Sequence, residues 1–216
     1  MLKLDKLLSS QEGKIFLLGV LLFFIYSISI ISVYLFSVKD ANNLIAMTLT
    51  NFFFGRAAGI SYGFTAGFND EIIILANMII EFITVMIIYP LFVLSWKKSV
   101  NIEMLRGFFT KIKEQRIKYQ SFFQKYGKYG LFIFVWFPFW MTGPVVGAII
   151  GFLIGVKHYV TMLVVLSGTS LAIIIWTHFL KEIMHLLDQL SSNAPYILLA
   201  LFVVIALVLK FMKNKK

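Results

Sequence analysis

The stretch YGLFIFVWFPFWMTGPVVGAIIGFLIGV, residues 129–156, is apolar along its whole length but is interrupted at its centre. It carries no charged side chain, yet Pro138, Gly143 and Pro144 fall within seven residues. Proline lacks an amide donor and clashes with the preceding helical turn, so one continuous helix is not expected here. Each half would form roughly 19 Å of helix, which is too short to cross a bilayer core of about 30 Å. We therefore predict a re-entrant hairpin, whose broken backbone must be buried in protein or line a wet cavity.

Five further apolar blocks accompany this one. Of the 216 residues, 60% are hydrophobic and only 14% are charged, whereas soluble domains are usually about 45–50% apolar and about 25% charged. The block 42–69 resembles 129–156 because it is also rich in glycine, so it is predicted to be a second hairpin. The other four blocks are predicted to be spanning helices, since roughly 20 apolar residues cross a bilayer. They are residues 15–37, 72–96, 159–180 and 194–209.

The distribution of basic residues supports the two hairpins. If both broken blocks turn back, the segments predicted inside are 1–14, 97–128, 157–158 and 210–216, and they hold 17 of the 20 Lys and Arg residues. If both blocks cross instead, eight Lys and Arg residues lie outside and eleven inside. The positive-inside rule favours the hairpins, which then enter from opposite sides. The predicted fold is all-α: a polytopic integral membrane protein with four spanning helices and two re-entrant helical hairpins in an inverted repeat.

The blocks also divide the chain. The first half is residues 15–96 and the second is residues 129–209. Residues 1–14 are predicted to be an amphipathic segment on the membrane surface, 97–128 a basic amphipathic cytoplasmic linker and 210–216 a basic cytoplasmic tail. Because the basic residues flank apolar spans, the net charge of +10 indicates membrane lipids and not nucleic acid as the partner. The expected location is a bacterial plasma (inner) membrane, with both termini cytoplasmic.

The segment FPFWMTGPVVGAIIG, residues 137–151, resembles the second signature of the small multi-drug export protein family. That signature has a proline, a Thr-Gly pair and a Gly-Ala helix start, fitted here by Pro138, Thr142, Gly143, Gly147 and Ala148. Arg56 and the residues 57–59 fit the family's first signature, although Phe54 stands where the family has an acidic residue. The family is similar to the DedA/VTT group. Over about residues 44–180, the resemblance implies paired re-entrant hairpins and a role in lipid flipping or drug export.

Arg56 and Glu81 are the only two formal charges within the six apolar blocks. A charge at the bilayer centre costs several kcal/mol, so such residues usually face a cavity or a partner. Arg56 lies near the middle of its block, and Glu81 lies about 15 Å down its span at helical rise. Their matching depths predict that they lie close together. Arginine binds phosphate or carboxylate through its planar fork, and a carboxylate carries a proton or attracts a cation. A purely structural ion pair is the alternative.

Two further groups of residues are candidates. The predicted tip of the second hairpin exposes backbone groups for a substrate or an ion, or is a plain kink, and it consists of Pro138, Thr142, Gly143 and Pro144. Small residues at four-residue spacing pack helices closely. The glycines predicted to pack the hairpins are Gly59, Gly63, Gly67, Gly147 and Gly151. The spacing of Gly59, Gly63 and Gly67 matches that of residues 143, 147 and 151 in the second hairpin.

No set of residues suggests an enzyme. The chain has no cysteine and only three histidines, of which His158 and His178 lie near span ends and are expected at the membrane interface. No catalytic residues, metal or cofactor are predicted. The predicted function is a secondary transporter or flippase-like lipid translocase for a small polar or phosphate-bearing lipid substrate, with protons as a coupling ion. The alternatives are an exporter of small cationic drugs, or a scaffold without transport that forms a homodimer through its glycine faces.

Overall fold

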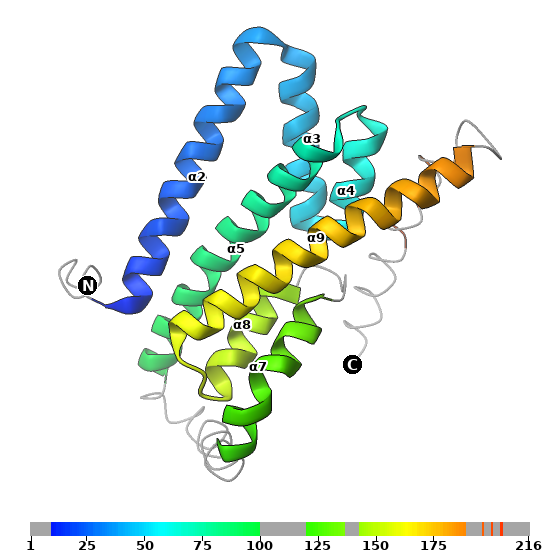
Figure 1. Ribbon diagram of the computed structural model, residues 1–216. Coiled ribbons are helices and arrows are strands. Elements are labelled where there is room, and N and C mark those ends of the chain that lie inside the picture. Colours follow the sequence, from blue (N-terminus) through cyan, green and yellow to red (C-terminus); the bar gives the residue numbers. More distant parts are fainter. Residues whose placement is uncertain are drawn as a thin grey trace. The chain divides into compact units, whose positions relative to one another are not determined.

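A computed structural model describes residues 10–99, 120–136 and 143–188, together with Tyr196, Ala200 and Val204. Figure 1 shows the helices in chain order. They are α2 Gln11–Phe36, α3 Val38–Phe54, α4 Arg56–Thr65, α5 Asp70–Ser99, α7 Gln120–Trp136, α8 Gly143–Leu153 and α9 His158–Asp188. None of the described residues lies in a strand. The predicted all-α class is therefore confirmed.

Three of the helices are long and apolar enough to cross a membrane, judged by length and composition. These stretches are Gln11–Phe36, Asp70–Trp96 and His158–Leu186. They overlap the predicted spans 15–37, 72–96 and 159–180. The fourth predicted span, 194–209, falls almost entirely outside the described residues, as do most of the segments 1–14 and 97–128 and all of 210–216. The number of spans and the side on which the termini lie stay predictions.

Helix α2 begins four residues before the predicted span. The Ser10 hydroxyl accepts a hydrogen bond of 3.0 Å from the Gly13 amide, which satisfies one of the free N–H groups of the first turn. Glu12 is favourable in this turn because its carboxylate lies near the positive end of the helix dipole. It is buried, at 4% exposure. The predicted surface segment 1–14 therefore ends in residues that belong to a packed helix.

The chain turns back at Gly55, between α3 and α4. Gly55 has a φ of 89°, a value that side chains other than glycine rarely adopt. A Cβ atom at Gly59 would stand 2.7 Å from Asn51 Cβ, and one at Gly63 would stand 2.9 Å from Met47 Sδ. These contacts join residues at equal distances on either side of Gly55, so α3 and α4 run antiparallel. The predicted turn within block 42–69 is present, while its entry into a membrane stays a prediction.

Helices α7 and α8 pack in the same manner. A Cβ atom at Gly147 would stand 2.5 Å from Val135 Cγ2, and one at Gly151 would stand 3.1 Å from Leu131 Cδ2. The two contacts are spaced equally about residue 141, so these helices are also antiparallel. Helix α7 ends at Trp136 and α8 begins at Gly143, and the residues between them lie outside the described ranges.

A hairpin followed by a long helix occurs twice, at an offset of 88 positions. The offset relates Asp70, the first residue of α5, to His158, the first residue of α9. It also relates glycines 55, 59, 63 and 67 to glycines 143, 147, 151 and 155. Gly67 and Gly155 have φ values of 81° and 86°, and both turns close with a bond from the next amide to the carbonyl four residues before the glycine. The chain therefore contains an internal repeat, and its inversion in the membrane stays a prediction.

The register of this repeat differs from the one that glycine spacing suggests. Matching glycines 59, 63 and 67 with 143, 147 and 151 is one helical turn out of step with the structure. The repeat is also unequal in charge, because the positions 88 residues after Arg56 and Glu81 hold Pro144 and Thr169.

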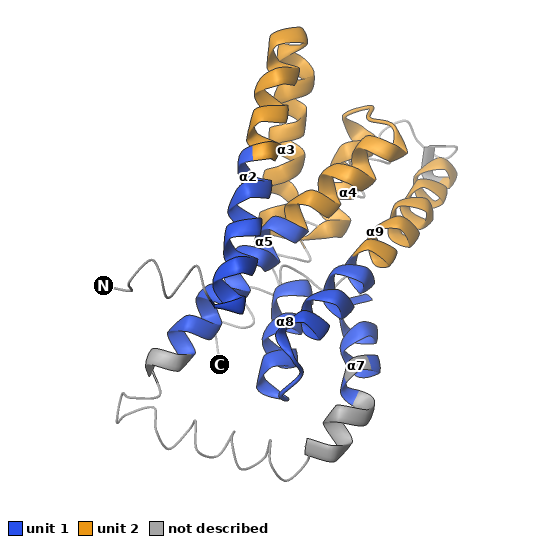
Figure 2. Cartoon of the chain, turned by 60° about the vertical axis from the view of Figure 1, so that its left-hand side comes forward, with its two compact units in different colours: residues 1–24, 82–137, 143–169 blue, residues 25–81, 138–142, 170–216 orange. Residues whose placement is uncertain are grey.

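The chain divides into two compact units, shown in Figure 2. Unit 1 comprises residues 1–24, 82–137 and 143–169, and unit 2 comprises 25–81, 138–142 and 170–216. Each unit contains one hairpin and its own apolar core. The core of unit 1 includes Tyr89, Val135 and Val165, and that of unit 2 includes Ile60 and Ile73. Only 17% of the most apolar part of α2 is buried, as expected for a helix that faces lipid.

Candidate functional site

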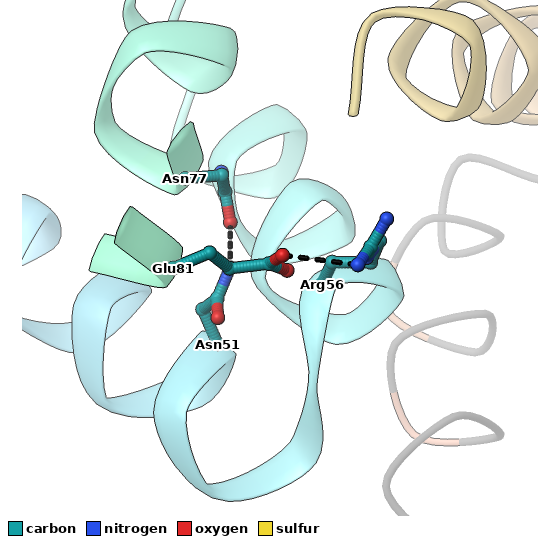
Figure 3. A network of polar contacts seen from close by, with 4 residues as sticks. All are labelled: Asn51, Arg56, Asn77 and Glu81. Atoms are coloured by element: carbon teal, nitrogen blue, oxygen red, sulfur yellow. Dashed lines mark hydrogen bonds and ion pairs between the residues drawn. The ribbon is translucent and has the colours of Figure 1, made fainter. Parts of the chain in front are cut away.

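Arg56 and Glu81 form a buried ion pair in unit 2. Arg56 is the first residue of α4, directly after the Gly55 turn, and Glu81 lies on α5. The guanidinium Nη2 donates to Glu81 Oε2 at 3.0 Å, and the two side chains are only 2% and 9% exposed. The predicted proximity of the two charges is confirmed (Figure 3). Their part in transport stays a prediction.

The glycines of α4 explain why the pair forms. A Cβ atom at Gly63 would stand 2.7 Å from Ile73 Cγ1, and one at Gly59 would stand 2.5 Å from Asn77 Oδ1. Residues 73, 77 and 81 follow one another at helical spacing, so they share one face of α5. The absence of side chains at the two glycines lets α4 approach this face closely, which places Glu81 beside Arg56.

Two asparagines that the sequence analysis did not select complete the polar cluster. The Asn51 amide on α3 donates to Asn77 Oδ1 at 2.5 Å, and the Asn77 amide donates to the Ile73 carbonyl at 2.7 Å. Both asparagines are buried, at 5% and 0% exposure. This bond joins α3 to α5 next to the ion pair, as Figure 3 shows. Asn77 precedes Glu81 by one turn in an otherwise apolar helix, and that spacing is a signal that could have identified it.

One arm of the Arg56 guanidinium has no partner among the described residues. Nη1 is buried and makes no hydrogen bond to any residue that the structure describes, and the same holds for Ser61 Oγ on α4. A buried donor without a partner costs about 1–3 kcal/mol, and more when it is charged. Such a group in a native fold requires an explanation, of which an anion-binding role is one. Arginine suits that role because its planar fork matches carboxylate and phosphate oxygens.

The predicted tip of the second hairpin is described in part. Gly143 and Pro144 are buried at the start of α8. Proline is favourable in a first helical turn, where its missing N–H group would have no helical partner. Pro144 therefore lies in the first turn of α8, and whether the tip binds a substrate or is a plain kink stays a prediction. Pro138 and Thr142 lie outside the described residues.

The predicted packing glycines have two different roles. Gly59, Gly63, Gly147 and Gly151 lie at close helix contacts within their own units. Gly67 does not, because no atom of the described residues lies within 4 Å of the position of its Cβ, and its positive φ forms the turn before α5 instead. The four packing glycines contact helices of their own chain, and the homodimer stays a prediction.

The charge of the site limits its chemistry. Within the described ranges, no group of three or more His, Cys, Asp or Glu residues could hold a metal ion. Arg56 and Glu81 offer one fixed cation and one carboxylate that is able to take up a proton. Such a pair is suited to binding and releasing a charged group.

Comparison with known proteins supports this class of function. Residues 55–175, from the Gly55 turn into α9, match the family described as "Putative small multi-drug export protein". No curated protein sequence and no solved structure matches the chain. The further resemblance to the DedA/VTT group stays a prediction. Since the match covers more than half of the 216 residues, the chain belongs to the small multi-drug export protein family, whose description indicates a membrane exporter.

Proposed function

We propose that the protein is a secondary transporter in which the Arg56–Glu81 pair opens to bind the charged group of the substrate. The observation that carries the proposal is the buried guanidinium of Arg56. Its Nη2 donates to Glu81, while its Nη1 has no partner among the described residues. Charged residues inside membrane proteins usually mark substrate or ion pathways. A phosphate or carboxylate would engage Nη1 first and then displace Glu81 from Nη2.

The protonation chemistry of the two side chains favours an anionic substrate. When an anion displaces Glu81, the released carboxylate is able to take up a proton, so no unpaired charge stays buried. When a cation displaces Arg56 from Glu81, the guanidinium is left charged, because arginine does not lose its proton in proteins. An anion entering with one proton is electroneutral, whereas a cation leaves a net positive charge. We therefore favour a small polar anion or the phosphate group of a lipid, with a proton as the coupling ion.

Export of small cationic drugs is the second candidate, and the family match is the observation that favours it. In that case Glu81 would bind the drug, and Arg56 would need a new partner. Binding of an anion requires Arg56, whereas binding of a cationic drug requires Glu81. Substitutions at these two positions therefore distinguish the two candidate functions.

The test is reconstitution of the full chain in liposomes with two probes, a phosphatidylglycerol with a fluorescent acyl chain and the cationic dye ethidium. We expect the lipid probe to move, and we expect Arg56→Ala to reduce its rate at least about tenfold, equivalent to about 1.4 kcal/mol of lost interaction. Glu81→Gln, which imitates the protonated carboxyl group, should retain binding of the lipid probe but lose its dependence on the proton gradient. The control is Lys181→Ala, which removes an exposed ion pair with Asp70.

Two results would contradict the anionic proposal. Ethidium transport that survives Arg56→Ala and is lost in Glu81→Gln would establish the cationic exporter. Movement of neither probe above protein-free liposomes would overturn transport of both classes.

A further inference from the structure

A second polar cluster lies in unit 1 and shares no residue with the Arg56–Glu81 pair. The Tyr89 hydroxyl and His158 Nδ1 are 2.6 Å apart, and His158 Nε2 lies 3.1 Å from Glu12 Oε1. The three residues come from α5, α9 and α2. Tyr89 is fully buried and Glu12 is 4% exposed. We call these three residues the histidine cluster.

The histidine is the member of this cluster that is open to its surroundings. Its side chain is 22% exposed, against 5% for that of Glu12. A cavity of about 520 Å³ lies beside it, lined among others by Gln11, Phe152 and Lys157. The Phe152 ring stacks on the imidazole, with centroids 6.0 Å apart and planes inclined by 22°. A proton in the cavity therefore reaches His158 more readily than it reaches either partner.

The two contacts of the imidazole allow it to gain a proton without losing a hydrogen bond. In the neutral ring, Nε2–H donates to the Glu12 carboxylate, and Nδ1 accepts from the Tyr89 hydroxyl. Uptake of one proton puts hydrogen on both ring nitrogens. Nδ1–H then donates to the Tyr89 oxygen, Tyr89 keeps its own proton, and the ring becomes a cation beside Glu12. The direction of the Tyr89–His158 hydrogen bond is thereby reversed.

We propose that His158 is a second site at which the protein binds a coupling proton, in addition to the proton that Glu81 takes up when the Arg56–Glu81 pair opens. Glu12 stabilises the charged ring, and Tyr89 responds to it. The role in coupling rests on the proposed transport function. Tyr89 lies eight residues after Glu81 on the same helix, α5, so reversal of its hydrogen bond acts on the helix that carries Glu81. Histidine is suited to this role because it exchanges its proton near neutral pH.

The charged groups around His158 act in opposite directions. Glu12 on α2 favours the protonated ring, whereas Lys157, the preceding residue, disfavours it. Tyr89 on α5 is neutral in both states. Glu12 and Tyr89 contact the imidazole, and Lys157 and Tyr159 adjoin it in the lining of the cavity.

Proton binding is tested first without transport. The full chain with ¹⁵N-labelled histidine is placed in lipid nanodiscs, and the signals of its three histidines are assigned with single His→Gln variants. We expect the His158 ring signals to titrate between about pH 5 and pH 8. Tyr89→Phe and Glu12→Gln should each move the midpoint, Glu12→Gln to lower pH because it removes the stabilising charge. His178→Gln, at an exposed position on α9, is the matched control and should leave the midpoint unchanged. A His158 signal that is constant over this range, or unmoved by both variants, overturns the proton site.

Coupling is tested with whichever liposome probe the wild type moves. We expect His158→Gln to remove the acceleration by an imposed pH gradient while His178→Gln retains it, and Tyr89→Phe to reduce it. Transport that keeps its full pH dependence in His158→Gln refutes coupling but leaves the transporter proposal intact. If the wild type moves neither probe, the proposed function fails, and the nanodisc titration alone decides whether His158 binds the proton.

Discussion

Removal of either charge of the Arg56–Glu81 pair should destabilise the protein by different amounts. Breaking a buried ion pair by deleting one partner typically costs about 3–5 kcal/mol, because the other charge is left unpaired. Glu81→Ala leaves a guanidinium that does not lose its proton, so its cost should lie at the upper end of that range. Arg56→Ala leaves a carboxylate that is able to take up a proton, so its cost should be lower, about 2–3 kcal/mol. Both side chains are at least nine-tenths buried, so solvent screening does not reduce these values.

The assay is equilibrium unfolding in detergent micelles, applied to both single variants and to Arg56→Ala/Glu81→Ala. The double variant removes both charges, so it should be more stable than Glu81→Ala alone. The matched control is the Asp70–Lys181 pair in the same unit, whose 2.7 Å contact is shorter but whose lysine side chain is 52% exposed. Its double-mutant cycle should give less than about 1 kcal/mol of coupling.

The same variants distinguish a functional pair from a structural one. If the pair serves transport, the double variant recovers stability but not probe movement in liposomes. A double variant that is fully active would refute the functional role. A double variant whose loss equals the sum of the single losses would refute the energetic reasoning, because it would show no coupling between the two residues.

Three further predictions concern packing, the second hairpin and topology. Gly59→Ala should destabilise by about 1–3 kcal/mol, because its Cβ would stand 2.5 Å from an asparagine oxygen. Gly130→Ala meets no atom of the described residues within 4 Å, so it should be neutral or stabilising in thermal unfolding. Gly143→Leu, at a buried helix start, should reduce transport more than membrane insertion, and normal transport would show that this position tolerates a side chain. Single cysteines at Ser99 and Lys216 should resist membrane-impermeant reagents applied outside, and external labelling would reject the predicted orientation.

Much of the architecture follows from local rules of sequence. The turns at the two hairpins are predictable because proline and glycine interrupt otherwise continuous apolar blocks. The proximity of Arg56 and Glu81 is predictable because a bilayer leaves an isolated charge few alternatives to pairing.

The register of the internal repeat is not predictable in the same way. Glycines spaced four residues apart in one hairpin align equally well with those of the other hairpin when the alignment is shifted by four residues. The spacing alone is therefore compatible with two registers of the repeat. The structure distinguishes them through Gly67 and Gly155, whose positive φ values mark the end of each hairpin. The backbone conformation of these two turns therefore determines the register of the repeat, which the glycine spacing does not.

The polar clusters were missed for another reason. Asn51 and Asn77 are uncharged, so counting formal charges does not detect them. The histidine cluster joins residues 12, 89 and 158, which lie far apart in the chain and on three different helices. No local pattern links such residues, and only the packing of unit 1 brings them together.

The offset of 88 positions has a consequence for the origin of the molecule. A repeat of this kind is the result expected when a half-length gene duplicates and its two products become one chain. Before such a fusion, two identical copies would both have carried the arginine and the glutamate, or both have lacked them. After fusion each copy was free to change alone, and the present chain keeps the pair in one copy while Pro144 and Thr169 occupy the corresponding places in the other. The two halves have thus become specialised, because only the first keeps the buried arginine and glutamate.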